Sequence, residues 1–428
     1  MRIFHLFVCG IALAGCSRWA AGSQPFQAYE SNDGPTSLKA VQRSETLSAW
    51  QTRADHHFRL LYGFYGSPDG STPEAALVAM NGVLYGTTSA GGEYGAQSRN
   101  GYGTVFEIDA TGHESVLYSF KGGRDGASPV GALTVMNGRL YGTTTFDEPQ
   151  EDCFEGSWPL CGNGTVFELN LSGKERVLYH FKGGKDGSNP FGGLVAVHGI
   201  LYGTTLSGGC CVKGAPTDGD GTVFEVTTSG SERVIYRFGG QPGDGAHPMA
   251  SLIAATGKLY GSTTSGGSHN LGTVFEVTAS GEERVLHSFA GCPADGAIPQ
   301  DGVTALNGFF YGTTLEGGTG SPSGCGEPAV GAGVVYEVNR SGDERVLYSF
   351  PIGGVDNQPI GGLLALNDKL YGTTRNDVFE ISTSGQQHAL VQEVAGSQAR
   401  LIVMNEKLYG TTLGGGATNN GAVFELTP

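Results

Sequence analysis

The feature that most constrains the fold is the pentapeptide LYGTT, which occurs seven times in the chain with at most one substitution per copy. Successive copies are 56, 61, 58, 51, 60 and 38 residues apart, counted between their tyrosines. Recurrence of this kind cannot arise by chance and indicates a tandem repeat. The seven tyrosines are Tyr85, Tyr141, Tyr202, Tyr260, Tyr311, Tyr371 and Tyr409.

Each copy is followed by further marks in a fixed order: GTVFE or a relative, then ERVLYSF or a relative, then a loop GG-x-DG-x-x-P. In residues 192–238 these marks form four β-prone segments, GLVAV, ILYGTT, GTVFEVT and ERVIYRF. A tight turn HG, a Gly-rich loop and a turn TSG separate them. We therefore predict an all-β fold, a seven-bladed β-propeller with four-stranded blades. The alternatives are an open solenoid or a sandwich, which should show a capping repeat or a non-integral repeat count.

The two ends of the chain predict how the ring closes. The C-terminus stops at GAVFELTP, the third strand of the seventh unit, whereas FRLLYGF at residues 58–64 aligns with the fourth-strand motif ERVLYSF. We expect the N-terminal strand to complete the C-terminal blade. The same alignment sets the third-strand Glu opposite the fourth-strand Arg in several units, so Glu425 should find Arg59 and serve with it as a structural pair.

Composition supports many short strands and excludes one class of partner. Gly accounts for 73 of 428 residues and charged residues for only 15%, as turns and short strands require. The formal net charge of −16 repels phosphate backbones, and there is no basic run. We expect no nucleic-acid partner and a monomer.

The first 15 residues predict a lipoprotein signal peptide, since Arg2 precedes an apolar segment too short to span a membrane. Residues 13–16, Leu-Ala-Gly-Cys, resemble the lipobox of bacterial lipoproteins, which implies lipid attachment at Cys16 and a membrane anchor. The alternative is an ordinary secretory signal with a chance cysteine. Ser17 is not the Asp that retains such proteins at the inner membrane, so we expect the outer membrane of the cell envelope. Residues 16–56 are polar and lack the repeat, which predicts a flexible tether before a propeller at 57–428.

Taken together, the motifs LYGTT, GG, GTVFE, SG, LYSF and DG-x-x-P resemble the tandem GloVer repeats of bacterial surface proteins, and their layout is similar to kelch blades. The resemblance covers about residues 57–428 and implies a propeller at the envelope. It implies no activity, cofactor or ligand. The sixth unit departs from the pattern, since NDVFE lacks the Gly-rich loop and HALVQEV replaces ERVLYSF.

In a propeller the loops after the second and fourth strands of each blade emerge on one face. All long, variable insertions fall there, so we expect this long-loop face to bind a protein or glycan partner. A carbohydrate-active enzyme using the same face is the main alternative, and a scaffold in an outer-membrane assembly is a second one. The acidic loop residues have a plainer interpretation as solvated charge, and the two aromatic ones as a small loop core. The candidate ligand-face residues are Asp147, Glu148, Asp152, Phe154, Trp158, Asp218, Asp220, Glu316, Glu327 and Arg375.

No catalytic residue, metal ligand or cofactor follows from the motifs, because neither HExxH nor GxSxG nor a Cys-x-x-Cys pair is present. The recurring Asp of the DG loops, one per blade, is interpreted as an Asx turn rather than a calcium ligand. These aspartates are Asp69, Asp125, Asp186, Asp244 and Asp295.

Two further expectations concern the loops. We predict disulfides between Cys153 and Cys161, between Cys292 and Cys325, and between the adjacent Cys210 and Cys211. Only eight residues separate Tyr371 from Phe379, which predicts a tight hairpin at Arg375 and a notch in the long-loop face.

Overall fold

A computed structural model describes residues 58–94, 101–147, 162–210, 219–240, 242–319, 332–351, 358–392, 394, 396 and 399–428. The expected signal peptide, Cys16 and nearly all of the tether lie outside these ranges. Residues Ala54–Pro428 form one compact unit. No helix in the described part of the chain is long and apolar enough to cross a membrane.

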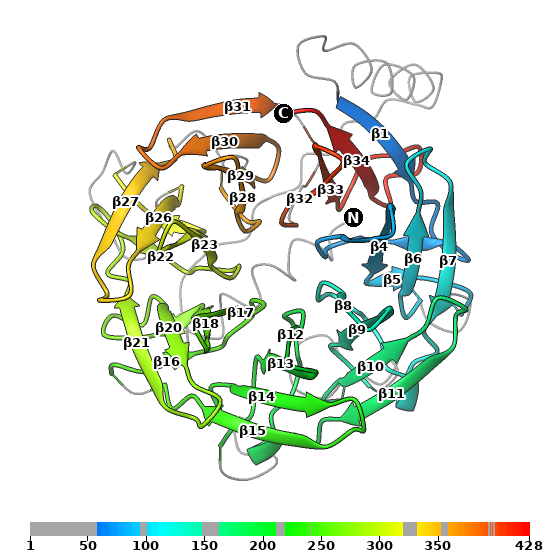
Figure 1. The fold of residues 1–428 in the computed structure, drawn as a ribbon, viewed down its shortest axis with the longest axis horizontal. Helices are drawn as coiled ribbons and strands as arrows, with labels where there is room; N and C mark the ends of the chain where they lie inside the picture. The colour runs from blue at the N-terminus through cyan, green and yellow to red at the C-terminus, as the bar shows by residue number, and fades with distance from the viewer. Residues whose placement is uncertain are drawn as a thin grey trace, which may run out of the picture. The chain divides into compact units, whose positions relative to one another are not determined.

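The predicted seven-bladed propeller is confirmed: seven four-stranded antiparallel sheets stand around one axis (Figure 1). The innermost strands are β3 (Val78–Met80), β8 (Thr134–Met136), β12 (Val195–Val197), β17 (Ile253–Ala255), β23 (Thr304–Leu306), β28 (Leu364–Leu366) and β32 (Ile402–Met404). Each LYGTT motif forms the second strand: β4 (Val83–Thr88), β9 (Arg139–Thr144), β13 (Ile200–Thr205), β18 (Lys258–Thr263), β24 (Phe309–Thr314), β29 (Lys369–Thr373) and β33 (Lys407–Thr412).

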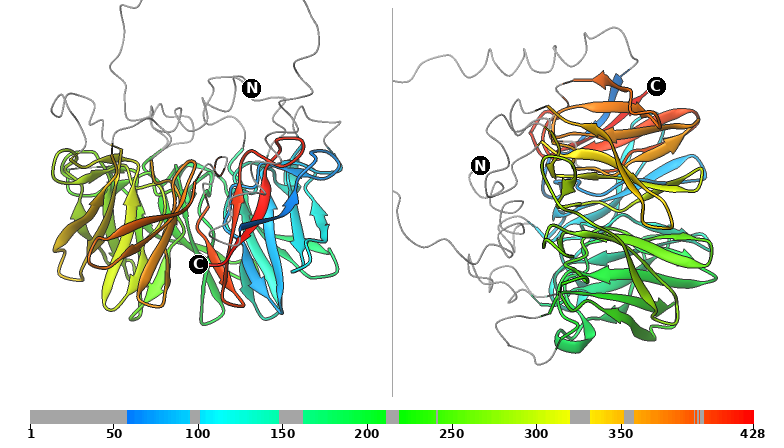
Figure 2. Two further views of the ribbon diagram at one scale, coloured as in Figure 1. Left: turned by 90° about the horizontal axis from the view of Figure 1, so that it is seen from above. Right: turned by 90° about the vertical axis from the view of Figure 1, so that its left-hand side faces the viewer.

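The GTVFE motifs form the third strands, which are β6 (Thr104–Ile108), β10 (Thr165–Leu169), β14 (Thr222–Thr227), β20 (Thr273–Val277), β26 (Val334–Val338), β30 (Val378–Ser382) and β34 (Ala422–Leu426). The outer strands are β7 (Glu114–Ser119), β11 (Glu175–His180), β15 (Glu232–Arg237), β21 (Glu283–Ser288), β27 (Glu344–Ser349), β31 (Gln387–Val391) and β1 (Phe58–Gly63). Blades are numbered 1 to 7 in the order of their innermost strands. Figure 2 shows the ring edge-on, with the strands running between its two faces.

Ring closure follows the prediction. Strand β1 pairs with β34, so blade 7 is built from β32, β33, β34 and β1. Arg59 lies opposite Glu425 in this ladder, and its Nε is 3.0 Å from the Glu425 Oε1. The two ends of the ring therefore share one sheet, which leaves no open edge between them.

Packing between blades explains why LYGTT recurs. Its Leu and Tyr are buried, as in Leu84 and Tyr85, and a Cβ at Gly86 would lie 2.5 Å from the Phe106 ring of the next strand. Phe106 in turn packs edge-on against Phe64 of the preceding blade, with ring centroids 5.0 Å apart. The glycine is therefore required for the third-strand Phe to reach the neighbouring blade.

The fourth-strand arginines join each blade to the next one. Arg59 donates through Nη2 to the Ala110 carbonyl of blade 1 while it also pairs with Glu425 of its own blade. The same double contact recurs at four other arginines, Arg176, Arg233, Arg284 and Arg345. The Glu–Arg register predicted from the repeats is confirmed at all of these positions.

The connections divide between the two faces as expected. The turns after the first strands are two-residue turns with both φ angles positive, for example 54° at Asn81 and 79° at Gly82, which suits a right-twisted hairpin. On the long-loop face three short ladders tie the inter-blade linkers to the loops after the second strands. They are β2 (Gly70–Ser71) with β5 (Ala90–Gly91), β16 (Gly245–Ala246) with β19 (Ser265–Gly266), and β22 (Gly296–Ala297) with β25 (Glu316–Gly317).

Candidate functional site

A recurring polar cluster lies at five of the outer interfaces between blades. Its first member is a fourth-strand Tyr, whose hydroxyl donates to the Asp of the following DG loop; Tyr62 and Asp69 are 2.9 Å apart. The third member is a Glu at the start of the outer strand of the next blade, here Glu114. The other clusters are Tyr118–Asp125–Glu175, Tyr179–Asp186–Glu232, Tyr236–Asp244–Glu283 and His287–Asp295–Glu344.

The Asp of each cluster is held by its loop. Asp69 Oδ2 accepts from the backbone NH of Tyr65 and its Oδ1 from that of Gly70. Equivalent contacts from the residue four or five positions earlier recur at the other four aspartates. The interpretation of the DG aspartates as turn residues is confirmed, and the structure adds a second role, since the same carboxylates accept from the Tyr or His.

The Glu of each cluster is held close to its neutral form. Burial raises the pKa of Glu114 to about 7, and the neighbouring Asp69 charge raises it further. Burial also raises the pKa of Tyr62, so this phenol stays protonated. The pKa of Glu175, Glu232, Glu283 and Glu344 is likewise raised to about 7, first by burial and then by the adjacent aspartate. Because the set repeats, we assign it to holding blades together.

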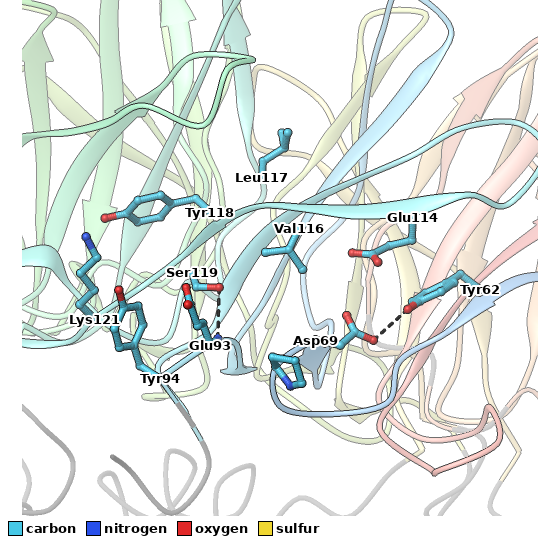
Figure 3. A pocket seen from close by; sticks show the side chains of 11 residues that line it. Tyr62, Asp69, Glu93, Tyr94, Glu114, Val116, Leu117, Tyr118, Ser119 and Lys121 are labelled. Carbon is cyan, nitrogen blue, oxygen red and sulfur yellow. Dashed lines mark hydrogen bonds between the residues drawn. The ribbon is translucent and has the colours of Figure 1, made fainter. Parts of the chain in front are cut away.

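At the interface of blades 7 and 1 this cluster forms one end of an open pocket of about 660 Å³ (Figure 3). At the other end lie Tyr94, Tyr118 and Lys121, with Glu93, whose NH is bonded to the Ser119 hydroxyl. Val116 lies between the two ends and is 36% exposed. Glu93 and Tyr94 follow β5, in the loop after the second strand of blade 1, so the pocket extends from the outer wall to the long-loop face.

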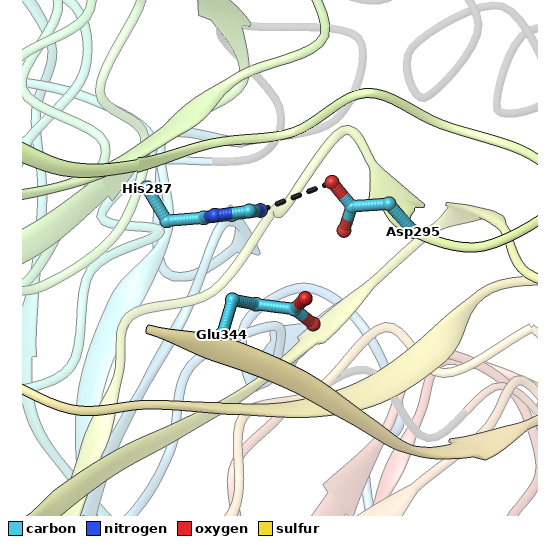
Figure 4. Close-up of side chains that lie close together, drawn as sticks. All are labelled: His287, Asp295 and Glu344. Carbon is cyan, nitrogen blue, oxygen red and sulfur yellow. Dashed lines mark hydrogen bonds and ion pairs between the residues drawn. The ribbon is translucent and has the colours of Figure 1, made fainter. Parts of the chain in front are cut away.

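The interface of blades 4 and 5 departs from this pattern. The fourth-strand Tyr is replaced by His287, whose Nε2 lies 3.0 Å from Asp295 Oδ2, and Glu344 faces both (Figure 4). Each of the three residues offers a ligand atom within 4.8 Å of the other two.

Four of the ten candidate ligand-face residues are described, and they lie in four different blades. Asp147 accepts from the Asn163 NH at 2.6 Å and is 3.8 Å from His180. Burial raises the pKa of Asp220 and of Glu316, which stands in β25. Arg375 is in the hairpin of blade 6 and donates its NH to Gln358. No hydrogen bond or ion pair joins any two of these four, so they form no common site.

The tight hairpin predicted for blade 6 is confirmed, since the Thr374 NH donates to Asp377 between β29 and β30. The notch beside it stays a prediction because most of the long loops lie outside the described residues. The same holds for Glu148, Asp152, Phe154, Trp158, Asp218 and Glu327. Cys153, Cys161, Cys211 and Cys325 are outside as well, so the three disulfides remain predictions.

Sequence reasoning missed the Tyr and Glu of the outer clusters and the pocket beside them. The signal was present in the repeat, because ERVLYSF carries the Glu and the Tyr at constant spacing. Only ERVLHSF, residues 283–289, has His at the Tyr position among the described fourth strands that precede a DG loop.

Comparison with solved structures supports the architecture. A streptogramin B lyase structure matches with a TM-score of 0.55 at 14% identity, covering 88% of this chain and 98% of that one. The gluconolactonase XC5397 from Xanthomonas campestris matches with a TM-score of 0.44 at 14% identity, covering 96% and 99%. BamB from Moraxella catarrhalis matches with a TM-score of 0.43 at 12% identity, covering 87% and 98%. At these identities the similarity concerns the fold alone.

No curated protein matches the sequence. The Gloeobacter/Verrucomicrobia repeat matches residues 154–380, which is more than half of the chain. This agrees with the resemblance in the repeat motifs and with the seven blades they form. The protein belongs to the Gloeobacter/Verrucomicrobia repeat family.

Proposed function

We propose that this protein is a binding protein of the cell envelope whose propeller captures a glycan in the pocket between blades 7 and 1. The observation that carries the proposal is the pocket itself, about 660 Å³ in volume and lined by Tyr94 and Tyr118 beside charged groups. Pockets for small ligands typically measure ~300–1,000 Å³ and combine aromatic walls with a few polar groups. Tyrosine rings offer a flat apolar face to a sugar ring, and carboxylates accept from its hydroxyls.

The charges lining the pocket select among sugars. Glu93, Asp69 and Glu114 face it from different elements, and Lys121 is the one cation among its lining residues. Lys121 also lies over the Tyr118 ring, 5.8 Å from the centroid. An acidic lining repels uronic acids and sulfated sugars. The ligand class is therefore a neutral or amino-sugar oligosaccharide.

A glycan array with the purified protein tests this proposal. We expect binding to neutral or amino-sugar oligosaccharides and loss of at least tenfold in affinity for Tyr94→Ala. Tyr65→Ala is the matched control, because Tyr65 is 62% exposed but does not line the pocket. Undiminished binding by Tyr94→Ala shows that the pocket is not the site.

The carbohydrate-active enzyme remains the second candidate, and one observation favours it: Asp69 and Glu114 lie together in the pocket, and the pKa of Glu114 is near neutrality. The same pair recurs at other interfaces, which favours a structural role. Incubation of bound oligosaccharides with the protein decides between them, since chain shortening or an unsaturated product requires catalysis. A scaffold role in an outer-membrane assembly would instead be revealed by a protein partner that survives Tyr94→Ala.

The envelope location is part of the proposal and rests on the N-terminal sequence. Cys16 would carry lipid and hold the propeller at the outer membrane through the polar segment that follows. Metabolic labelling with a radioactive fatty acid should mark the wild type and leave Cys16→Ser unlabelled. A labelled Cys16→Ser protein contradicts the anchor.

A further inference from the structure

The interface of blades 4 and 5 differs from its four sister clusters in a single side chain. In the sisters a Tyr hydroxyl donates to the loop Asp, and burial raises the pKa of the phenol, as at Tyr236. A protonated phenol is a poor metal ligand. His287 replaces it with a neutral imidazole, a common metal ligand, while the Asp and the Glu are retained.

We propose that His287, Asp295 and Glu344 bind one divalent transition-metal ion, with Zn²⁺ as the preferred ion. Imidazole nitrogen and carboxylate oxygen are ligands that Zn²⁺ accepts, and three protein ligands leave a fourth position for water. The candidate ligand atoms come from three elements: the outer strand β21, the linker after it, and the outer strand β27 of the next blade.

The geometry requires only a small contraction. A tetrahedral ion with ligand distances of ~2.1 Å places its ligand atoms ~3.4 Å apart. His287 Nε2 and Asp295 Oδ2 are already 3.0 Å apart, and no pair in the set exceeds 4.8 Å. Glu344 can supply the movement, because its Oε1 is enclosed and accepts no hydrogen bond from the described residues.

The two other ligands are already oriented. The His287 ring packs edge-on against Phe289 with centroids 4.9 Å apart. Asp295 Oδ2 also accepts from the Ala290 NH at 2.8 Å, and its Oδ1 accepts from the Gly296 NH. Hydrogen bonds of this kind fix a carboxylate for metal binding. The side chains of His287 and Asp295 are 17% and 11% exposed, so an ion can reach them from the outer wall.

The ion would join blade 4 to blade 5. Its charge also balances the two carboxylates, which repel each other and raise the pKa of Glu344. Zinc binding should therefore stabilise the folded ring, because the ligands from the two blades come together only in the native state.

The test uses the full chain without a histidine tag and Zn²⁺ as the probe. Calorimetric titration of the metal-free wild type should give one equivalent that His287→Tyr lacks, and the melting temperature should rise with Zn²⁺ in the wild type alone. His287→Tyr restores the residue found at the four sister interfaces, so it is expected to fold. Other sites, such as the remaining histidines, contribute equally to both proteins. Identical titrations of the two proteins overturn the proposal.

A converse variant tests whether the three side chains suffice. Tyr236→His creates the same set at the interface of blades 3 and 4, with Asp244 and Glu283 in place. We expect one additional equivalent of Zn²⁺. If the variant folds, as far-ultraviolet circular dichroism will show, and gains none, the claim that His, Asp and Glu at this interface form the site is wrong.

Discussion

Arg59 and Arg345 occupy equivalent places in blades 7 and 5, yet their removal should have unequal costs. Arg59 pairs with Glu425, which also holds Lys407 Nζ at 3.0 Å and Tyr409 Oη at 3.3 Å. Arg345 pairs with Glu337 at 2.7 Å, and the residue that corresponds to Lys407 is Phe309. Truncating Arg345 therefore leaves a carboxylate without a cation, whereas truncating Arg59 does not.

The magnitudes follow from exposure. Both glutamates are nearly buried, with side chains 8% and 10% exposed, while the arginines are about half exposed. Arg59→Ala loses a solvated ion pair and the bond to Ala110, for a cost of about 1–2 kcal/mol. A buried charge left unpaired costs ~3–5 kcal/mol, so with partial solvation we expect Arg345→Ala to cost about 2–3 kcal/mol.

Urea denaturation followed by circular dichroism measures these costs as shifts in the midpoint at unchanged slope. Charge exchange provides the control. Arg345→Glu with Glu337→Arg should recover most of the stability lost in Arg345→Glu. Arg59→Glu with Glu425→Arg should recover less, because the arginine introduced at position 425 lies beside Lys407. If Arg59→Ala is as damaging as Arg345→Ala, the sharing of Glu425 between two cations has no energetic weight.

Three further predictions concern closure, glycine and pH. Deleting residues 57–64 removes β1 and the fully buried Phe64; losing a buried Phe alone costs ~3–5 kcal/mol, so an unchanged melting temperature would refute the closure. Gly112→Ala should destabilise more than Gly82→Ala, because both have positive φ but only at Gly112 would a Cβ meet backbone, 2.6 Å from the Leu61 carbonyl; equal melting temperatures would contradict this. Burial raises the pKa of Glu114, Glu175, Glu232 and Glu283 to about 7. Stability from their protonated forms is present below pH ~4.5 and is lost as the pH rises through 7, by ~1 kcal/mol each after allowance for solvent screening. Glu114→Gln should raise the urea midpoint at pH 8 relative to pH 5.5, and a variant with no such change would remove Glu114 from the account.

The loop predictions can be checked directly as well. Peptide mapping without reduction should recover Cys153 linked to Cys161, and free thiols at both positions would contradict that disulfide. A long loop grafted after Arg375 should abolish partner binding if the notch of blade 6 is used, and unchanged binding excludes it.

The repeat in the sequence was sufficient for the blade count, the strand order and the register within each blade. These features are local, because strands joined by short turns must pair and a fixed turn length sets which residues lie opposite. Ring closure through Arg59 and Glu425 also followed from alignment, since residues 58–64 carry the fourth-strand motif that the last unit lacks. Here the repeat transfers a local register to residues 366 positions apart.

Contacts between blades were decided only by the tertiary structure. The loop-face candidates Asp147, Asp220, Glu316 and Arg375 do not converge, while the Tyr, Asp and Glu of the outer clusters do. Each cluster draws its members from two blades and a linker, and their distances depend on how the sheets pack side by side rather than on spacing along the chain. For the same reason His287 is a single change in a motif when viewed in sequence, and becomes part of a His–Asp–Glu set only when blade 5 places Glu344 beside it.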